Sequence, residues 1–271
     1  MSYIASIHGP KNSGKSTLAA KIPGKSGWLD LEFGSLRALA NLDKTDQLRH
    51  KVWRPKDKET RELLMEIMTK ERGDKLQGRR ELWNIVMGAY AAFLQDDDID
   101  NIIFDTWKMS WNMNTMFHLQ ATQEDAIRTG KKPRSNLIQI EYGPPNARQN
   151  GIITGAAAMG KNLILLSHDR DKYERRFVDG KWEEGPTGEK ELDGFNATLN
   201  NADWAFSSEF IQPCPRISED KHKCPGFHFE FTVVKAGMQI GMLGKKFESE
   251  TVLTLLQQDK EKGENLAVRF A

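Results

Sequence analysis

Near its amino terminus the sequence reads Gly9-Pro10-Lys11-Asn12-Ser13-Gly14-Lys15-Ser16-Thr17, which fits the pattern GxxxxGK[ST] in full. This stretch follows an apolar run over residues 3–7 that is typical of a strand, and it opens a segment over 16–22 that is typical of a helix. A glycine-rich turn in that position points successive backbone N–H groups inward, so they and the helix N-terminus form an anion site. The pattern therefore predicts that all nine residues bind the phosphates of a nucleoside triphosphate.

Two chemical roles follow for the end of this loop. Lys15 is expected to reach the β- and γ-phosphates, and the Ser16 hydroxyl is expected to ligate Mg²⁺. The metal also needs a carboxylate, and Asp105 ends the apolar run Asn101-Ile102-Ile103-Phe104, which has the form of a buried parallel strand. We expect this strand to lie beside the loop's own strand and Asp105 to complete the Mg²⁺ site, although an Asp there can also serve only as a turn residue.

The composition limits the class of protein that this chain can be. The chain has 271 residues, a net charge of +1 and 38% hydrophobic residues, which describes an ordinary globular protein. No apolar run is long enough to span a membrane and no signal peptide is apparent, so a cytoplasmic location is expected. The two cysteines argue against a disulfide framework. Because the net charge is close to zero, any contact with nucleic acid is expected to come from local basic patches.

Strand-like and helical segments alternate along most of the chain, which predicts an α/β fold with a mainly parallel central sheet flanked by helices. Three apolar runs end in polar residues, at Glu32, Asp105 and His168. In a parallel sheet these residues gather at one edge, where ligands bind. Residues 36–94 look mostly helical, with a short strand near 50–54. Residues 169–193 read as a mobile loop or a hairpin, and later alternating runs predict an antiparallel C-terminal extension.

The order of these motifs resembles the RecA-like recombination ATPases, over about residues 3 to 240. The loop is similar to that family's GPxSSGKTT, and Asp30-Leu31-Glu32 is similar to its D-x-E. The resemblance implies that Glu32 polarises the attacking water, with Asp30 as the other candidate. It implies that His168 senses the γ-phosphate, where the family has Gln, and that Lys235 in Thr232-Val233-Val234-Lys235 reaches the ATP of a neighbouring subunit.

The resemblance also carries expectations about the whole protein. It implies one RecA-like ATPase domain over 1–271, ATP and Mg²⁺ as ligands, and a homo-oligomeric ring or filament with ATP at the subunit interfaces. No oligomerisation helix is expected before the first strand and no separate domain after the core. In lacking these parts the chain looks like the minimal bacteriophage ATPases of recombination and single-strand annealing. That resemblance implies a location in the host cytoplasm. It also implies a single-strand-binding or replication protein as a further partner.

Single-stranded DNA is the partner that the resemblance implies. Two basic segments are the candidates for its contacts, and their cations are Arg128, Lys131, Lys132, Arg134, Lys172, Arg175 and Arg176. Tyr173 and Phe177 are interleaved with the second segment and suit stacking on unpaired bases. Glu174, Glu183 and Glu184 dilute its charge, so a solvated, non-binding surface is the alternative.

One cluster lies outside the resemblance, in an insertion over about 212–228. Cys214, His222, Cys224 and His228 fall within fifteen residues, and Zn²⁺ takes four such ligands. Their spacing, Cys-x7-His-x-Cys-x3-His, matches no standard zinc motif. Reduced, unpaired thiols are therefore the favoured alternative.

Three functions compete at this stage. The leading one is an ATPase stimulated by single-stranded DNA in recombination or replication. A nucleotide-switched loader or scaffold that hydrolyses ATP slowly is the second. A small-molecule kinase is the third, and it requires an acceptor pocket and an arginine-bearing lid, for which Arg170, Arg175 and Arg176 are available.

Overall fold

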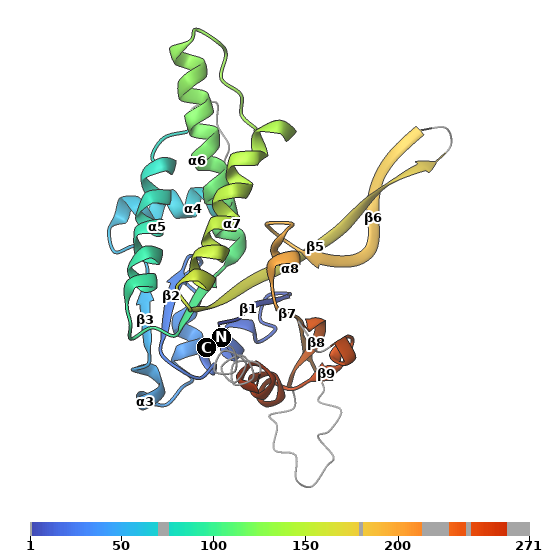
Figure 1. Ribbon diagram of the computed structural model, residues 1–271. Coiled ribbons are helices and arrows are strands. Elements are labelled where there is room, and N and C mark those ends of the chain that lie inside the picture. Colours follow the sequence, from blue (N-terminus) through green and yellow to red (C-terminus); the bar gives the residue numbers. More distant parts are fainter. Residues whose placement is uncertain (1, 70–75, 179–180, 213–227, 237–239, 259–271) are drawn as a thin grey trace.

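The computed structural model of the chain describes residues 2–69, 76–178, 181–212, 228–236 and 240–258, and Figure 1 shows their arrangement. Its centre is a sheet whose described strands run in the order β3-β2-β4-β5-β1-β7-β8-β9, with β6 paired to β5 alone. The strands with parallel neighbours are β1 (Ile4–Gly9), β2 (Ser26–Asp30), β3 (His50–Trp53), β4 (Asn101–Asp105), β5 (Asn162–Val178) and β7 (Trp204–Ile211).

Helices cover both faces of this sheet. On one face lie α4 (Lys58–Met68), α5 (Arg79–Gln95), α6 (Trp107–Arg128) and α7 (Gly143–Ala158). The other face is covered by α1 (Lys15–Ala20), α2 (Ser35–Leu39) and a helical segment over residues 249–258. Short elements complete the chain: α3 (Lys44–Gln47), η1 (Gln139–Tyr142), α8 (Thr198–Asn201) and η2 (Ile240–Met242).

The central strands are apolar on both sides because both sides are covered. Leu163 and Leu165 of β5 pack into the core under α4 to α7, while Ile164 and Leu166 pack into the core under α1 and α2. All four side chains are fully buried. A run without alternation is what a strand between two helical layers requires.

The strand order corrects one expectation. Asp105 ends β4, and β4 does not lie beside β1, because β5 is inserted between them and pairs with both in parallel. The segment of β5 over 163–166 is fully buried, as β1 and β4 are, so it fits between these two strands under both helical layers. The site residues still meet, since β1 and β4 end at the same edge and β5 leaves the parallel sheet there.

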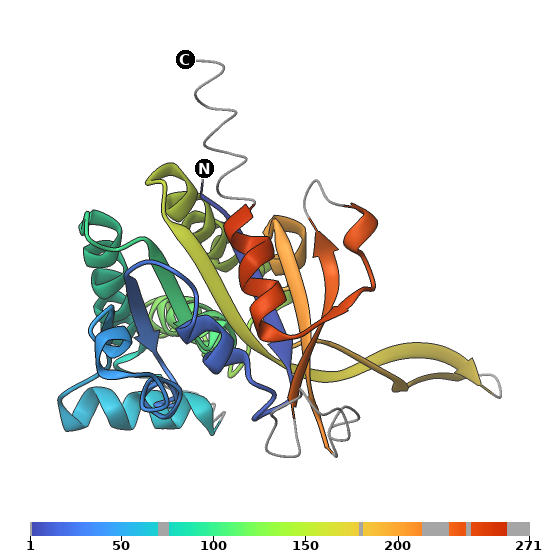
Figure 2. The same ribbon diagram turned by 90° about the horizontal axis from the view of Figure 1, so that it is seen from below.

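The segment predicted as a loop or hairpin is a hairpin. β5 continues past the sheet to Val178, and β6 (Lys181–Leu192) returns antiparallel to it, with Arg175 opposite Glu184. Figures 1 and 2 show this ribbon projecting away from the body of the protein. Cross-strand ion pairs join Arg170 to Glu191 and Lys172 to Glu189, so acidic and basic side chains compensate each other along the arm.

The C-terminal extension is antiparallel, as expected. β8 (His228–Ala236) pairs antiparallel with β7, and β9 (Lys246–Phe247) pairs antiparallel with β8. Together with the parallel centre and the two helical layers, this confirms the predicted α/β class, with a mainly parallel central sheet flanked by helices and an antiparallel C-terminal extension. None of the described helices has the length and apolar content that a bilayer span requires.

Leu166 offers a test of the two-sided packing. Replacing Leu166 with Ala is expected to lower the free energy of unfolding by about 2 to 5 kcal/mol, because it opens a cavity in a fully buried strand. Urea unfolding followed by circular dichroism measures this. Leu48→Ala is the control, because Leu48 is 87% exposed and its loss is expected to change stability by less than about 0.5 kcal/mol. Equal effects of the two substitutions contradict the packing described.

Candidate active site

The loop between β1 and α1 has glycine where no other residue fits. Gly14 has a φ of 85°, and a Cβ there would lie 2.5 Å from the ring of Phe229. A Cβ on Gly9 would lie 2.3 Å from the backbone oxygen of Ser208. The Ser13 hydroxyl lies 2.6 Å from that of Ser208. β7 and β8 therefore hold the loop in one shape, which is the preorganisation that a phosphate site needs.

Lys15 is buried in this loop. Its Nζ donates to the carbonyl oxygens of Gly9 at 2.9 Å and Pro10 at 2.6 Å. Burial lowers the Lys15 pKa to about 8, against the opposing effect of the nearby carboxylates of Asp105, Asp169 and Glu32. A buried cation whose hydrogen-bond partners here are neutral oxygens, the two carbonyls and the Ser13 hydroxyl, is well suited to binding a phosphate.

The structure brings Ser16 and Asp105 together, although β1, which leads to Ser16, and β4, which ends at Asp105, are not neighbours. The Ser16 hydroxyl donates to Oδ2 of Asp105 at 3.0 Å. Burial raises the Asp105 pKa to about 6, and the carboxylates of Asp30 and Glu32 act in the same direction, while the Ser16 hydrogen bond opposes them. Negative charge is thus concentrated at the carboxyl ends of β2 and β4.

Mg²⁺ fits this donor set. A hydroxyl and a carboxylate oxygen, 3.0 Å apart at the foot of a phosphate loop, are oxygen ligands of the kind that Mg²⁺ takes. In the described part of the chain no three His, Cys, Asp or Glu side chains come together as a metal-binding group. That agrees with the usual Mg²⁺ site, in which one or two protein ligands are joined by water and substrate phosphates.

Glu32 lies between two hydrogen-bond donors. Oε1 accepts from the Thr106 hydroxyl at 2.7 Å, and Oε2 lies 3.1 Å from Nε2 of His168. Burial by itself raises the Glu32 pKa, but the bonds from His168 and Thr106 and the charges of His168 and Lys11 outweigh it and hold the pKa below its ordinary value. Glu32 is therefore an ionised carboxylate, fixed at the edge where the phosphates are expected.

Asp30, the other candidate for the catalytic carboxylate, is engaged in structure. It is fully buried, its Oδ1 accepts from the backbone N–H of Gly34 and Ser35, and its Oδ2 pairs with Arg54. These bonds hold the turn that leads into α2. Of the two acids, Glu32 is the one with a side chain turned to the expected site, and Thr106, which the sequence reasoning missed, helps to hold it there.

Lys235 lies away from the loop of its own chain. Its Nζ donates to the backbone oxygens of Leu199 and Asn200, at 2.9 and 2.8 Å, at the end of α8. In the β7–β8 ladder it is opposite Ala205, whose partner on β1 is Ser6, so it lies near the start of β1 rather than its end. A role in a neighbouring subunit requires these two bonds to break, and that role stays a prediction.

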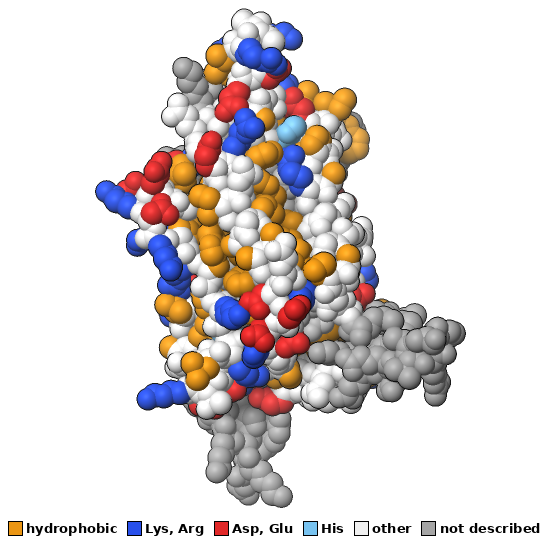
Figure 3. Space-filling model, turned by 60° about the vertical axis from the view of Figure 1, so that its left-hand side comes forward, with side chains coloured by type: hydrophobic (Ala, Val, Ile, Leu, Met, Phe, Trp, Pro, Cys, Tyr) orange, Lys and Arg blue, Asp and Glu red, His pale blue; other side chains and the backbone are white. Residues whose placement is uncertain are grey.

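Three of the seven basic residues proposed to contact DNA form ion pairs within the described part of the chain. Arg128 bonds Asp125, Arg134 bonds Glu141 and Lys172 bonds Glu189. Lys131 and Lys132 are exposed, and no ion pair to either occurs within the described ranges. Figure 3 shows basic side chains at the tip that follows α6, and acidic and basic side chains interspersed over the rest of that face. The side chain of Arg176 lies outside the described part of the structure.

Of the four proposed zinc ligands, one lies within the described residues. Cys214, His222 and Cys224 lie outside the described residues. His228 begins β8, opposite Ile211, as an ordinary member of the β7–β8 ladder. The zinc site thus stays a prediction.

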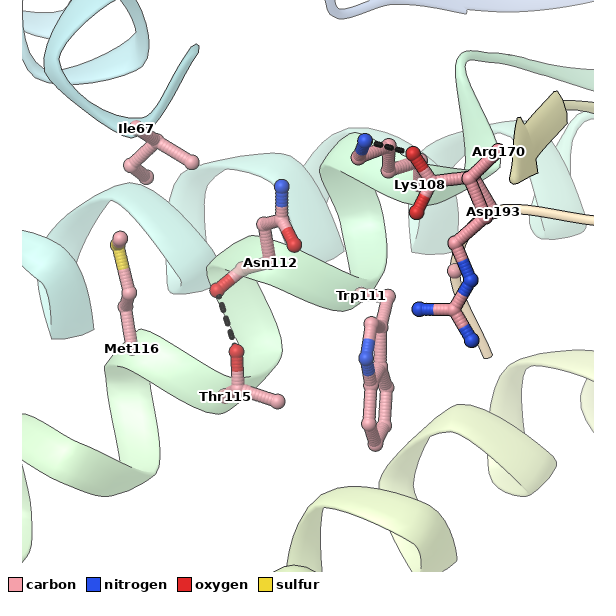
Figure 4. Close-up of a pocket in the computed structure, with 9 residues that line it drawn as sticks. Ile67, Lys108, Trp111, Asn112, Thr115, Met116, Arg170 and Asp193 are labelled. Atoms are coloured by element: carbon pink, nitrogen blue, oxygen red, sulfur yellow. Dashed lines mark hydrogen bonds and ion pairs between the residues drawn. The ribbon is translucent and has the colours of Figure 1, made fainter. Parts of the chain in front are cut away.

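A pocket opens beside the root of the hairpin (Figure 4). It lies between α4, α6 and the part of β5 that continues past the sheet. Its volume is about 190 Å³, and the residues that line it are Ile67, Lys108, Trp111, Asn112, Thr115, Met116, Arg170, Asp193 and Gly194. Lys108 and Asp193 form an ion pair across it, and the backbone N–H of Asp193 donates to the His168 carbonyl. A hydrogen bond thus joins Asp193, in the pocket wall, to His168 of the candidate site.

Comparisons with known proteins give a likeness of fold alone. No protein-family model and no curated protein matches the sequence. Flagellar accessory protein FlaH from Methanocaldococcus jannaschii has a TM-score of 0.43 at 11% identity, over 90% of this chain and 83% of its own. A KaiC-like protein from Pyrococcus horikoshii OT3 has a TM-score of 0.41 at 11% identity, over 91% and 84%.

The class of this protein rests on its own residues. A phosphate-loop motif between β1 and α1, a buried lysine in it, and a Ser16–Asp105 pair at the carboxyl edge of a mainly parallel sheet are together the features of a P-loop nucleotide-binding protein.

Asp105 predicts a pH dependence of stability without Mg²⁺ or nucleotide. Its pKa rises from 3.8 in the unfolded chain to about 6 in the fold, so the folded state binds the proton more tightly. Stability is therefore expected to fall as the pH rises from about 4 through about 6, by on the order of 3 kcal/mol. Asp105→Asn removes this loss, and urea unfolding of both proteins at several pH values measures the difference. Asp97→Asn, an exposed control, is expected to follow the wild type. The assignment is contradicted if the difference in stability between Asp105→Asn and the wild type does not increase with pH.

Proposed function

We propose that this protein is a Mg²⁺-dependent ATPase that acts on single-stranded DNA in recombination or replication. The observation that carries the hydrolytic part is the placement of Glu32. It is held by Thr106 and His168 at the edge where Lys15, Ser16 and Asp105 gather. A loader that only switches with bound nucleotide needs no such carboxylate.

The chain's own groups have distinct tasks in this proposal. The backbone of the loop and Lys15 bind the β- and γ-phosphates. Asp105 and Ser16 hold Mg²⁺, which when bound neutralises charge on the phosphate oxygens. Glu32 accepts a hydrogen bond from the attacking water and aligns it, because its pKa is held low and the carboxylate is ionised at neutral pH.

His168 connects hydrolysis with the hairpin. Its Nε2 contacts Glu32, and the next residue along the chain begins the β5–β6 ribbon. A change at the γ-phosphate that moves the His168 ring is therefore passed to the root of the arm. This supports a sensor role for His168, as the resemblance implied.

Assembly and DNA contact complete the proposal. We propose one ATPase domain over the whole chain, working as a ring or filament in which Lys235 reaches the ATP of a neighbour. Lys131 and Lys132 supply phosphate contacts, and the exposed Tyr173 supplies a ring for base stacking. A single-strand-binding or replication protein remains a proposed partner, and the expected cellular location is the cytoplasm.

One observation favours the nucleotide-switched loader as a second candidate. Three of the hairpin's cations, Arg170, Lys172 and Lys190, are paired with acids of the opposite strand, which reduces the positive charge available to a phosphate backbone. A projecting ribbon with partly compensated charge and exposed aromatic rings, such as Tyr173, is suited to contact another protein.

Two substitutions separate ATP binding from hydrolysis. Glu32→Gln is expected to lower kcat at least about a hundredfold and leave ATP binding within about threefold, because it removes only the group that acts on water. Lys15→Ala is expected to weaken ATP binding at least about tenfold, because it removes a buried charged donor. Phosphate release and titration with a fluorescent ATP analogue measure the two quantities, with and without single-stranded DNA.

The control for these variants is Glu62→Gln, an exposed acid on α4 that is expected to behave as wild type. Normal hydrolysis by Glu32→Gln would reject Glu32 as the group that acts on water. ATP binding without turnover in the wild type, with or without DNA, would favour the loader.

DNA contact is tested at the tip of α6. The double substitution Lys131→Ala with Lys132→Ala is expected to weaken binding to single-stranded DNA and to lower the slope of log affinity against log salt by about 1.4, since each lost phosphate contact removes about 0.7. Fluorescence anisotropy over a range of salt concentrations measures the slope. Lys44→Ala with Lys56→Ala, two exposed lysines elsewhere, is the matched control. An unchanged slope in the first variant argues against this contact.

A further inference from the structure

A second histidine–carboxylate pair lies beside the first and has no part in the chemistry so far. His8 immediately precedes Gly9 of the loop, and Asp169 immediately follows His168. Nδ1 of His8 lies 2.7 Å from Oδ1 of Asp169, and only 10% and 11% of these two side chains are exposed. Because a carboxylate accepts, the N–H of His8 donates. A short, buried bond of this kind fixes two chain segments relative to each other.

The bond lies where β5 changes partners. As far as His168, β5 pairs in parallel with β1, and Gly9 is opposite His168. From Asp169 onward it pairs antiparallel with β6, beginning with Leu192. The His8–Asp169 bond therefore joins the strand that carries the phosphate loop to the first residue of the hairpin.

The His8 ring is poorly explained as a packing residue. Its Nε2 is buried and has no hydrogen-bond partner among the described residues, and the same is true of the hydroxyls of Ser6 and Ser167. The register places Ser6, His8 and Ser167 on one face of neighbouring strands. An unsatisfied buried nitrogen is unfavourable, and an apolar side chain of similar size would avoid that cost. The bond to Asp169 is the contact that an apolar side chain would lose.

A movement of Asp169 would be transmitted to the Glu32 carboxylate. His168 is the adjoining residue, and its Nε2 is 3.1 Å from Glu32. Its carbonyl accepts from the N–H of Asp193, on the other side of the hairpin root. Asp169 also contributes to the field at Lys15, where its charge opposes the effect of burial. The junction is therefore linked to Glu32, to the loop lysine and to the hairpin.

We infer that His8 is a positioning residue for hydrolysis that acts through Asp169. The bond between them holds the β5 junction so that His168 stays on Glu32 and the hairpin root stays in register with the phosphate loop. The inference rests on the proposed ATPase function for its kinetic consequence, and on the structure alone for its effect on the junction.

The test compares two substitutions of His8. His8→Asn keeps a donor near the position of Nδ1, whereas His8→Leu has similar bulk and no donor. We expect His8→Leu to lower kcat at least about tenfold with the ATP dissociation constant within about twofold, and His8→Asn to retain at least about a third of wild-type kcat. Asp169→Ala should match His8→Leu, and combining the two should add no further loss. Ser6→Ala, which removes an unpartnered hydroxyl on the same strand face, is the control and should leave kcat unchanged.

A second readout does not depend on catalysis. Amide hydrogen exchange at residues 166–171 and 190–193 is expected to be at least about tenfold faster in His8→Leu than in wild type, and near wild type in His8→Asn. If the wild type hydrolyses no ATP, the proposed function fails while the exchange result still judges the junction. Unchanged exchange in His8→Leu overturns the inference. So does an equal loss of ATP binding and kcat in both His8 variants, because that indicates a general effect on folding.

Discussion

Parallel pairing of β5 with β1 on one side and β4 on the other is the constraint on which the site depends. The register sets Gly9 opposite His168, Leu166 opposite Asp105, and Asp105 opposite Asp30. Four strand ends are thereby brought to one edge at fixed offsets. A slip of one residue would turn every side chain of β5 to the other face, so the burial of residues 163–166 on both sides also secures the position of His168.

The charges at this edge are stabilised in different ways. Asp30 is fully buried and is satisfied by Arg54 and two backbone N–H groups, which makes it structural. Within the described ranges the Asp105 carboxylate accepts a side-chain hydrogen bond from Ser16 alone and its pKa is raised, so a bound cation would stabilise its charged form. Glu32 lies between these cases, since two side-chain donors keep it ionised and leave it at the edge of the site. Neighbouring acids thus take separate roles because their hydrogen-bond partners differ.

The hairpin is the part of the protein that departs most from a compact core. Three ion pairs join its two strands, so part of its charge is compensated within the hairpin itself. It is anchored at its root, where Asp169 contacts His8 and Asp193 contacts both His168 and Lys108. The bonds at this root join the arm to the edge that holds the candidate site, and the pocket of Figure 4 lies beside them.

The sequence alone determined the phosphate loop with its Lys15 and Ser16, the α/β class, and the gathering of Glu32, Asp105 and His168 at one edge of the sheet. These depend on local order: a glycine turn between a strand and a helix, and polar residues after apolar runs. The sequence did not reveal that β5 separates β1 from β4, since strand order is decided by which surfaces can be covered. Nor did it separate Asp30 from Glu32, or assign partners to His8, Thr106 and Lys235. Those roles depend on contacts such as Arg54 with Asp30 and His8 with Asp169, 161 residues apart, and only the tertiary structure brings such groups within hydrogen-bonding distance.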